Sequence, residues 1–215
     1  MSNLKFYMTP GSCSTGIHLL LEELELFFEA HVVNLMAGDN MRPAYLAINP
    51  RGAVPTLVRT DGTALTDFIA IARWLAETHP KRKLLPESEE QRRHALQLME
   101  YAVGVVHGEG FTRVFVAERY AGSPQGKTSV EHEGLQIVRK GFERLESLIV
   151  GPTYALGAFS IADAALFYVE FWADRIGISL PAKCERHYHA MLRRPAVRQV
   201  LGEEGYHAVL RQHPV

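Results

Sequence analysis

The sequence contains few cysteines and no long hydrophobic run. Two cysteines, Cys13 and Cys184, occur in 215 residues, which excludes the disulfide framework of a small secreted domain and indicates free thiols in a reducing compartment. No apolar run approaches the roughly 18 residues that a membrane span requires. The first residues have the pattern of a strand rather than of a signal peptide. We therefore expect a soluble cytoplasmic protein.

The sequence also has no large excess of positive or negative charge. Lys and Arg together number 23 and Asp and Glu 24, giving a formal net charge of -1. The protein as a whole therefore has no field that would attract nucleic acid or an anionic membrane, and we expect neither as a partner. A hydrophobic share of 47% with 22% charged residues is typical of globular proteins, and the length suits one large domain or two small ones.

A strand, a turn and a helix are predicted around Cys13. Apolar and polar residues alternate from Leu4 to Met8, as in a half-buried strand, and Pro10-Gly11 ends the pattern. Cys13 is then expected at the start of a helix, where unpaired N–H groups and the helix dipole favour a thiolate and attract anions. The alternative is a small, buried, apolar cysteine. The apolar stripe that predicts the helix is Ile17, Leu20, Leu21 and Leu24.

The remainder of residues 1–80 completes a βαβ-ββα order. Residues 27–33 are rich in aromatic and β-branched side chains and predict a second strand, parallel to the first. Residues 53–58 and 63–65 flank Asp61-Gly62, a dipeptide typical of a two-residue hairpin turn. Thr66 or Asp67 can cap a following helix that ends near His79.

Residues 81–89 form a predicted linker, and residues 90–215 a predicted all-α domain built as a helical bundle. Three pairs have the spacing of a capping box, in which a hydroxyl and an acid or amide three residues later satisfy helix N–H groups. A long helix is expected over 95–120, with its glycines marking a bend or a close approach. Residues 161–175 are apolar all round and predict a buried central helix. The capping pairs are Ser88 with Gln91, Thr128 with Glu131, and Ser160 with Asp163, and the glycines are Gly104, Gly108 and Gly110.

Four motifs, in their order and spacing, resemble those of a known enzyme family. The first half, with a cysteine at its first helix and Val54-Pro55 at its third strand, has the plan of a thioredoxin-like domain. Together the motifs are similar to the cytosolic glutathione S-transferases, specifically the bacterial beta class. They are Tyr7-Met8-Thr9-Pro10-Gly11-Ser12-Cys13-Ser14, Ile48-Asn49-Pro50-Arg51-Gly52-Ala53-Val54-Pro55, Phe159-Ser160-Ile161-Ala162-Asp163 and Arg194-Pro195-Ala196-Val197.

The resemblance implies that glutathione is the co-substrate and lies extended across the thioredoxin-like domain. Its sulfur would meet Cys13, and donors at the helix start, from Cys13 and Ser14, would stabilise its thiolate. The backbone of its cysteinyl residue would pair with Val54, which precedes a cis Pro55. These two regions of the chain are therefore the expected centre of the reaction.

The resemblance also places both ends of the expected site. The γ-glutamyl group of glutathione would meet Asp67, which can hold its ammonium, and the helix start at Phe68, which can receive its carboxylate. Gly104 and His107 are the expected ligand-binding residues of the helical domain. Met8 occupies a position where the beta class usually has a second tyrosine, and this difference, with others, predicts weaker glutathione binding than is usual in the family.

Three functions are compatible with the sequence. The main hypothesis is a detoxifying transferase that joins the glutathione thiolate to small hydrophobic electrophiles, in a homodimer as the family implies. The alternative is glutathione-dependent thiol-disulfide exchange or reduction through Cys13. A second alternative is a non-catalytic protein that binds hydrophobic ligands or a partner with this fold. We expect no metal, because Cys184 with His187 is only a two-ligand fragment.

Overall fold

The computed structural model describes residues 3–214 and consists of two compact units. The first unit contains the chain up to Leu85 together with the segment from Met191 onward, and the second contains Pro86–Ala190. None of the helices in the described part of the chain combines the length and the apolar character needed to cross a bilayer.

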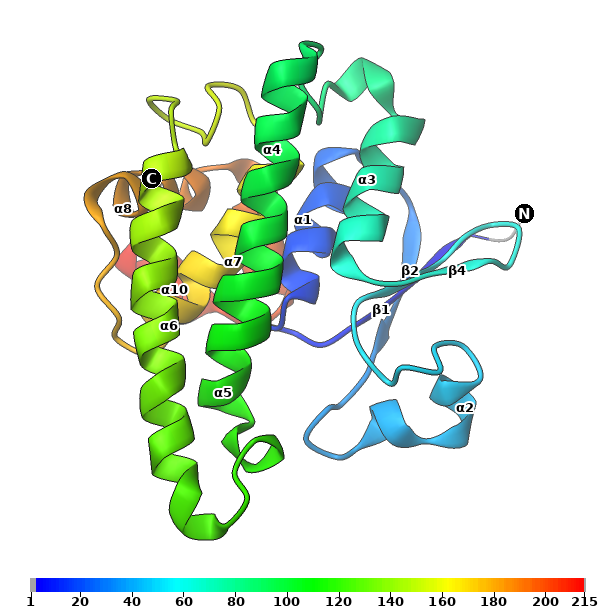
Figure 1. Cartoon of the computed structure of the whole chain (residues 1–215). Helices are drawn as coiled ribbons and strands as arrows, with labels where there is room; N and C mark the ends of the chain where they lie inside the picture. The colour runs from blue at the N-terminus through cyan, green and yellow to red at the C-terminus, as the bar shows by residue number, and fades with distance from the viewer. Residues whose placement is uncertain (1–2, 215) are drawn as a thin grey trace. The chain divides into compact units, whose positions relative to one another are not determined.

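A four-stranded sheet forms the centre of the first unit. Its strands are β1 (Leu4–Met8), β2 (Phe28–Val32), β3 (Thr56–Val58) and β4 (Ala64–Leu65), in the order β2-β1-β3-β4. The β1–β2 pair is parallel, and the β1–β3 and β3–β4 pairs are antiparallel. Helices α1 (Ser14–Glu23) and α3 (Phe68–Thr78) pack against each other beside the sheet, as Figure 1 shows. The thioredoxin-like βαβ-ββα order predicted from the sequence is confirmed.

Short elements complete the connections of the first unit. Helix α2 spans Pro43–Leu46, and single turns of 3-10 helix, η1 and η2, span Asp39–Met41 and Pro80–Arg82.

The turn between β3 and β4 differs from the prediction of a two-residue loop. Arg59 N donates to the Thr63 carbonyl at 2.9 Å, and Gly62 N donates to the Arg59 carbonyl at 2.9 Å. These bonds close a loop of three residues, with Gly62 in the left-handed region at φ 84°. The Asp61 carboxylate accepts from Thr63 N at 2.8 Å, so its side chain stabilises the longer turn.

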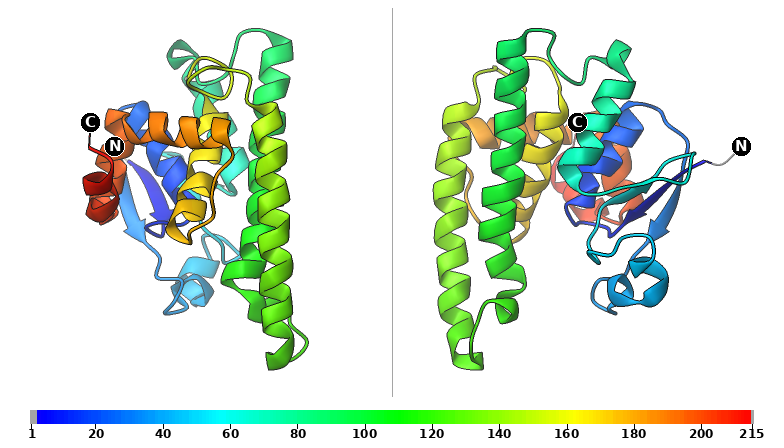
Figure 2. Two further views of the ribbon diagram at one scale, coloured as in Figure 1. Left: turned by 90° about the vertical axis from the view of Figure 1, so that its left-hand side faces the viewer. Right: turned by 45° about the vertical axis from the view of Figure 1, so that its right-hand side comes forward.

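The second unit is helical, and a long rod of helix runs beside a second long helix. The rod consists of α4 (Glu89–Tyr101), the π-helical segment η3 (Ala102–Phe111) and α5 (Thr112–Phe115), and α6 (Lys127–Leu148) lies alongside it (Figures 1 and 2). The close approach expected at one glycine is confirmed, because a Cβ atom on Gly110 would lie 2.7 Å from Val138 Cγ2. The remaining elements are η4 (Ala117–Arg119), η5 (Pro124–Gly126), α7 (Ile161–Arg175) and α8 (Ala182–Leu192).

Helix α7 is the core of the second unit, as its apolar sequence predicts. Every residue from Ile161 to Ala173 is buried. The capping box is complete: the Ser160 hydroxyl accepts from Ala162 N at 3.3 Å, and the Asp163 carboxylate accepts from Ser160 N at 2.7 Å. This cap defines where the buried helix begins.

The other two predicted caps have different outcomes. Ser88 accepts from Gln91 N at 3.5 Å and caps α4. The cap predicted at Thr128 is wrong, because α6 begins one residue earlier, at Lys127, after Gly126. A single turn of 3-10 helix leads directly into α6 there, so Thr128 lies inside the helix.

The C-terminal segment packs with the sheet-containing unit, whereas the sequence places it in the helical domain of residues 90–215. Helices α9 (Pro195–Glu203) and α10 (His207–Gln212) follow Arg194, and α9 packs against α1 (Figure 2). Arg194 forms a two-pronged ion pair with Glu23, with both N–O distances at 2.7 Å. Contacts between residues so distant in sequence leave no local pattern.

Glu204, in the C-terminal segment, makes buried hydrogen bonds with residues of the β1–α1 turn and of α1. Its carboxylate accepts from Gly11 N at 2.7 Å, from the Thr15 hydroxyl at 2.7 Å and from His18 Nδ1 at 2.9 Å. Gly11 has a left-handed φ of 72°, and a Cβ atom there would collide with the Tyr206 hydroxyl. The chain end therefore fixes the turn that carries Cys13.

Candidate active site

Cys13 lies at the N-cap of α1, between the β1–α1 turn and the helix. This placement confirms the predicted strand, turn and helix. The Cys13 side chain is 7% exposed, and its Sγ donates to the Val54 carbonyl at 3.4 Å. The two regions that sequence reasoning proposed as the reaction centre are therefore in direct contact.

Ser14 holds the turn in shape through its hydroxyl. Ser14 Oγ donates to the Thr9 carbonyl at 3.0 Å and accepts from Thr9 N at 3.1 Å. Ser14 N donates to Ser12 Oγ at 3.1 Å. Because Ser14 is fully buried and both its hydroxyl and its N–H are occupied, the residue holds the turn, and a ligand sulfur would have to replace Ser12 Oγ to receive the N–H.

The predicted preference of Cys13 for the thiolate is wrong for the ligand-free protein. Burial raises the pKa of the Cys13 thiol to about 12, although the N–H groups of Cys13 and Ser14 lower it. The negative charge of Asp67 raises it further. The helix-start donors act in the direction expected from the sequence, but removal of water from the sulfur outweighs them. Cys13 is thus a neutral S–H donor at pH 7.

The Val54–Pro55 peptide bond is cis, as the resemblance implies. The preceding carbonyl, of Ala53, accepts from the Tyr45 hydroxyl at 2.6 Å and from Asn49 Nδ2 at 2.8 Å. Both side chains are buried, and burial raises the pKa of Tyr45, so its hydroxyl remains a donor. These two residues fix the backbone next to Cys13. The sequence did not predict this role for either of them, although Asn49 belongs to the motif that ends in Val54-Pro55.

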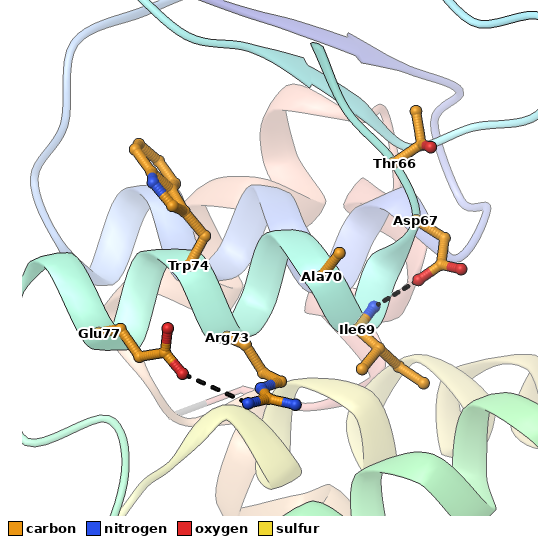
Figure 3. Close-up of a pocket in the computed structure, with 7 residues that line it drawn as sticks. All are labelled: Thr66, Asp67, Ile69, Ala70, Arg73, Trp74 and Glu77. Carbon is orange, nitrogen blue, oxygen red and sulfur yellow. Dashed lines mark hydrogen bonds and ion pairs between the residues drawn. The ribbon is translucent and has the colours of Figure 1, made fainter. Parts of the chain in front are cut away.

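Asp67 and Phe68 start α3, as predicted. The Asp67 carboxylate accepts from Ile69 N at 3.1 Å and caps the helix, as Figure 3 shows. Its other oxygen lies 3.5 Å from Arg51 Nη1. The Phe68 side chain is 2% exposed, so only its backbone is available to a ligand. The helix start therefore offers an accessible carboxylate beside the positive end of a helix dipole.

A hollow runs from Asp67 along the outward face of α3. It is lined by residues from one helix and the loop before it, and Arg73 within it forms an ion pair with Glu77 at 3.6 Å. The lining residues are Thr66, Asp67, Ile69, Ala70, Arg73, Trp74 and Glu77.

Gly104 and His107 belong to the π-helical segment of the second unit. His107 Nδ1 lies 3.1 Å from the Tyr168 hydroxyl, and its ring meets the Trp172 ring edge to face, with centroids 4.9 Å apart. Burial lowers the pKa of His107 to about 4, so the imidazole is neutral at pH 7. Gly104 is exposed, with no atom of another residue near the position of a Cβ.

The sequence matches the models of one enzyme family in both halves of the chain. The family model described as Glutathione S-transferase, N-terminal domain, matches residues 11–78, and the corresponding C-terminal domain model matches residues 115–202. The chain belongs to the glutathione S-transferase family. It is 33% identical over 213 residues to Glutathione S-transferase GstA of Escherichia coli O157:H7. The aligned region covers 94% of this chain and 99% of that protein.

Solved glutathione transferases share the whole fold. A glutathione transferase homolog from Sulfitobacter, solved with bound glutathione, superimposes with a TM-score of 0.87 at 27% identity, covering 94% of this chain and 99% of the other. A bacterial beta class glutathione S-transferase from Sphingomonas chungbukensis gives 0.78 at 26% identity, covering 94% and 98%. The predictions of a glutathione S-transferase enzyme and of glutathione as its co-substrate are confirmed.

Proposed function

We propose that the enzyme is of the beta class and joins the glutathione thiolate to small hydrophobic electrophiles. The observation that carries the proposal is the contact between the Cys13 thiol and the Val54 carbonyl, 3.4 Å apart, at the start of α1. The contact places a thiol that could donate to the glutathione sulfur next to Val54, whose backbone would pair with glutathione according to the resemblance. The likeness to the beta class structure from Sphingomonas chungbukensis supports the class assignment.

Glutathione binding would replace the hydrogen bond that Cys13 makes in the ligand-free protein. The N–H of the cysteinyl residue of glutathione would donate to the Val54 carbonyl, and the Cys13 S–H would be released. The γ-glutamyl carboxylate would receive N–H groups at the start of α3, while Asp67 would hold the ammonium. Asp67 is half exposed, with only a loose pairing to Arg51, so this exchange needs no buried charge to be separated.

The released S–H would then donate to the glutathione sulfur. Glutathione loses its thiol proton to water, and its thiolate is stabilised by Cys13 S–H and by the N–H groups at the helix start. The thiolate attacks the electrophilic carbon, a C–S bond forms, and the leaving group departs with the electron pair of the broken bond. Cys13 keeps its proton throughout, which agrees with the pKa of about 12 that burial gives its thiol.

The ionisation of Cys13 argues against the exchange alternative. Attack on a disulfide requires a thiolate, and the buried Cys13 thiol is neutral at pH 7 because burial raises its pKa. The residues that follow it, Ser14, Thr15 and Gly16, offer no second thiol to resolve a mixed disulfide. We therefore place conjugation ahead of exchange.

The resemblance also supplies the finer parts of the proposal. Gly104 and His107 would contact the ligand from the helical unit, with His107 as a neutral hydrogen-bonding group. The enzyme would act as a cytoplasmic homodimer that detoxifies electrophiles.

Steady-state kinetics of the wild type and Cys13→Ala separate the three functions. Conjugation is followed with glutathione and a chlorodinitrobenzene, and exchange with a mixed disulfide of glutathione. Our proposal expects conjugation by the wild type and reduced but measurable conjugation by Cys13→Ala. Exchange that disappears with Cys13 while conjugation stays at background would favour the oxidoreductase. Glutathione binding without either activity would favour the carrier.

A further inference from the structure

A cluster of metal-ligating side chains lies between α1 and α9, apart from the residues proposed for glutathione. His18 and Glu22 lie one helical turn apart on α1 and share a face, and Glu203 is the last residue of α9. One ligand atom from each of the three lies within 4.8 Å of the others. Because Glu203 is distant in sequence, no spacing pattern marks the cluster, and sequence reasoning expected no metal.

His18 is oriented as a metal ligand would be. Its ring is 4% exposed, and Nδ1 lies 2.9 Å from Glu204 Oε1. The other carboxylate oxygen, Glu204 Oε2, accepts from Gly11 N and the Thr15 hydroxyl, so Oε1 is left to accept a proton on Nδ1. A ligating histidine characteristically donates its other ring N–H to a carboxylate in this way.

The opposite nitrogen of His18 faces a group that cannot donate to it. Nε2 lies 3.2 Å from Glu203 Oε2, and a carboxylate only accepts hydrogen bonds. Nε2 and Glu203 Oε2 are therefore placed as two ligands of one cation would be. The 3.2 Å separation is close to the ligand–ligand edge of about 3.4 Å in a tetrahedral site with bonds of about 2.0–2.1 Å.

A second feature of the structure orients both carboxylates. The Gln199 amide donates to Glu22 Oε2 at 2.8 Å and to Glu203 Oε1 at 3.0 Å. One oxygen of each carboxylate is thus held by the amide, and the other is left for a cation. Gln199 would orient Glu22 and Glu203 for metal binding, as Glu204 orients His18.

The local charge is unfavourable without a cation. Glu22 and Glu203 lie in the last turns of their helices, where the dipole is negative and no basic residue is present, although cations are preferred there. The carboxylates of Glu22, Glu203 and Glu204 all lie close to the single imidazole of His18.

We propose that His18 Nε2, Glu22 and Glu203 bind a divalent transition-metal cation, with water completing the coordination. One imidazole and two carboxylates suit zinc and similar ions. The site would join α9 to α1 and thereby stabilise the C-terminal segment.

Titration calorimetry of the chelator-treated protein with zinc chloride tests the proposal. We expect one zinc site whose affinity falls at least tenfold in the Glu22→Gln/Glu203→Gln double variant, with conjugation activity unchanged. Glu29→Gln is the matched control, because Glu29 is an exposed glutamate 3.5 Å from His31 Nε2, and it should bind zinc as the wild type does.

A second variant removes the nitrogen ligand alone. His18→Asn retains an amide that can donate to Glu204 but has no counterpart of Nε2, and it should lose the same site. If the double variant and the wild type bind zinc equally, the metal is held by other histidines and the proposal is wrong. Absence of zinc binding by the wild type would overturn it as well.

Discussion

Replacing Glu204 with alanine tests how the C-terminal segment supports the turn that carries Cys13. The Glu204 carboxylate is 1% exposed and accepts hydrogen bonds from Gly11 N, Thr15 Oγ1 and His18 Nδ1 at 2.7 to 2.9 Å. The substitution leaves these three donors without their acceptor in a buried position. We expect lower stability and a less ordered β1–α1 turn.

The expected loss of stability follows from those donors. A buried group that loses its hydrogen-bond partner costs about 1–3 kcal/mol, and removal of one member of a buried charged pair costs about 3–5 kcal/mol. Water entering the space left by the side chain recovers part of the sum. We therefore expect the free energy of unfolding to fall by about 3–5 kcal/mol.

Urea unfolding at a fixed protein concentration measures the loss, and Glu29→Ala is the control. The Glu29 side chain is 48% exposed and the neighbouring His31 side chain is 39% exposed, so this replacement should change the free energy of unfolding by no more than about 0.5 kcal/mol. In Glu204→Ala, the KM for glutathione should also rise more than kcat falls. A stability loss below about 1 kcal/mol would refute the reasoning, because the three hydrogen bonds would then contribute little.

Three further predictions concern ionisation and positioning. Because burial raises the pKa of the Cys13 thiol to about 12, its alkylation rate, followed by peptide mapping, should rise about tenfold per pH unit from pH 7 to 10; a plateau near pH 8.5 would contradict this. Asn49→Ala removes a donor to the Ala53 carbonyl and should raise the KM for glutathione several-fold, with kcat within about twofold; equal KM values in steady-state kinetics would show that Asn49 does not position the backbone. Burial raises the pKa of Glu170 to about 7, above its ordinary 4.5, so the folded state retains this proton longer and stability should fall as pH rises from 4.5 to 7. Glu170→Gln should flatten that fall in a series of urea unfolding curves, and an unchanged slope would show that Glu170 does not cause it.

Local sequence patterns predicted most of the fold. Alternation from Leu4 to Met8, the break at Pro10-Gly11 and the all-apolar run after Ile161 each depend on neighbours within one element, and each corresponds to an observed strand, turn or helix. The Ser160 capping box succeeded for the same reason. The Thr128 cap failed because a turn of 3-10 helix precedes α6, and nothing in the three-residue spacing reveals it.

The candidate site was predictable only as far as its residues lie in motifs. Cys13 and Val54 belong to separate motifs that the structure brings into contact. The ionisation of Cys13 was not predictable, because it depends on burial by residues from elsewhere in the chain. Tyr45 acts through the Ala53 carbonyl, and Glu204 acts across nearly the whole length of the sequence. Contacts of this kind leave no periodic or local signal.

The most direct test of the proposed mechanism is the ionisation of bound glutathione. Ultraviolet difference absorbance of the thiolate, recorded across pH with saturating glutathione, gives the apparent pKa of the bound thiol in the wild type and in Cys13→Ala. We expect the apparent pKa in the wild type to lie below the ordinary thiol pKa of about 8.5. In Cys13→Ala it should lie between the wild-type pKa and the ordinary one, because one donor is lost and the backbone N–H groups remain. If the thiol of glutathione bound to the wild type titrates at the same pH as the thiol of free glutathione, the account is wrong.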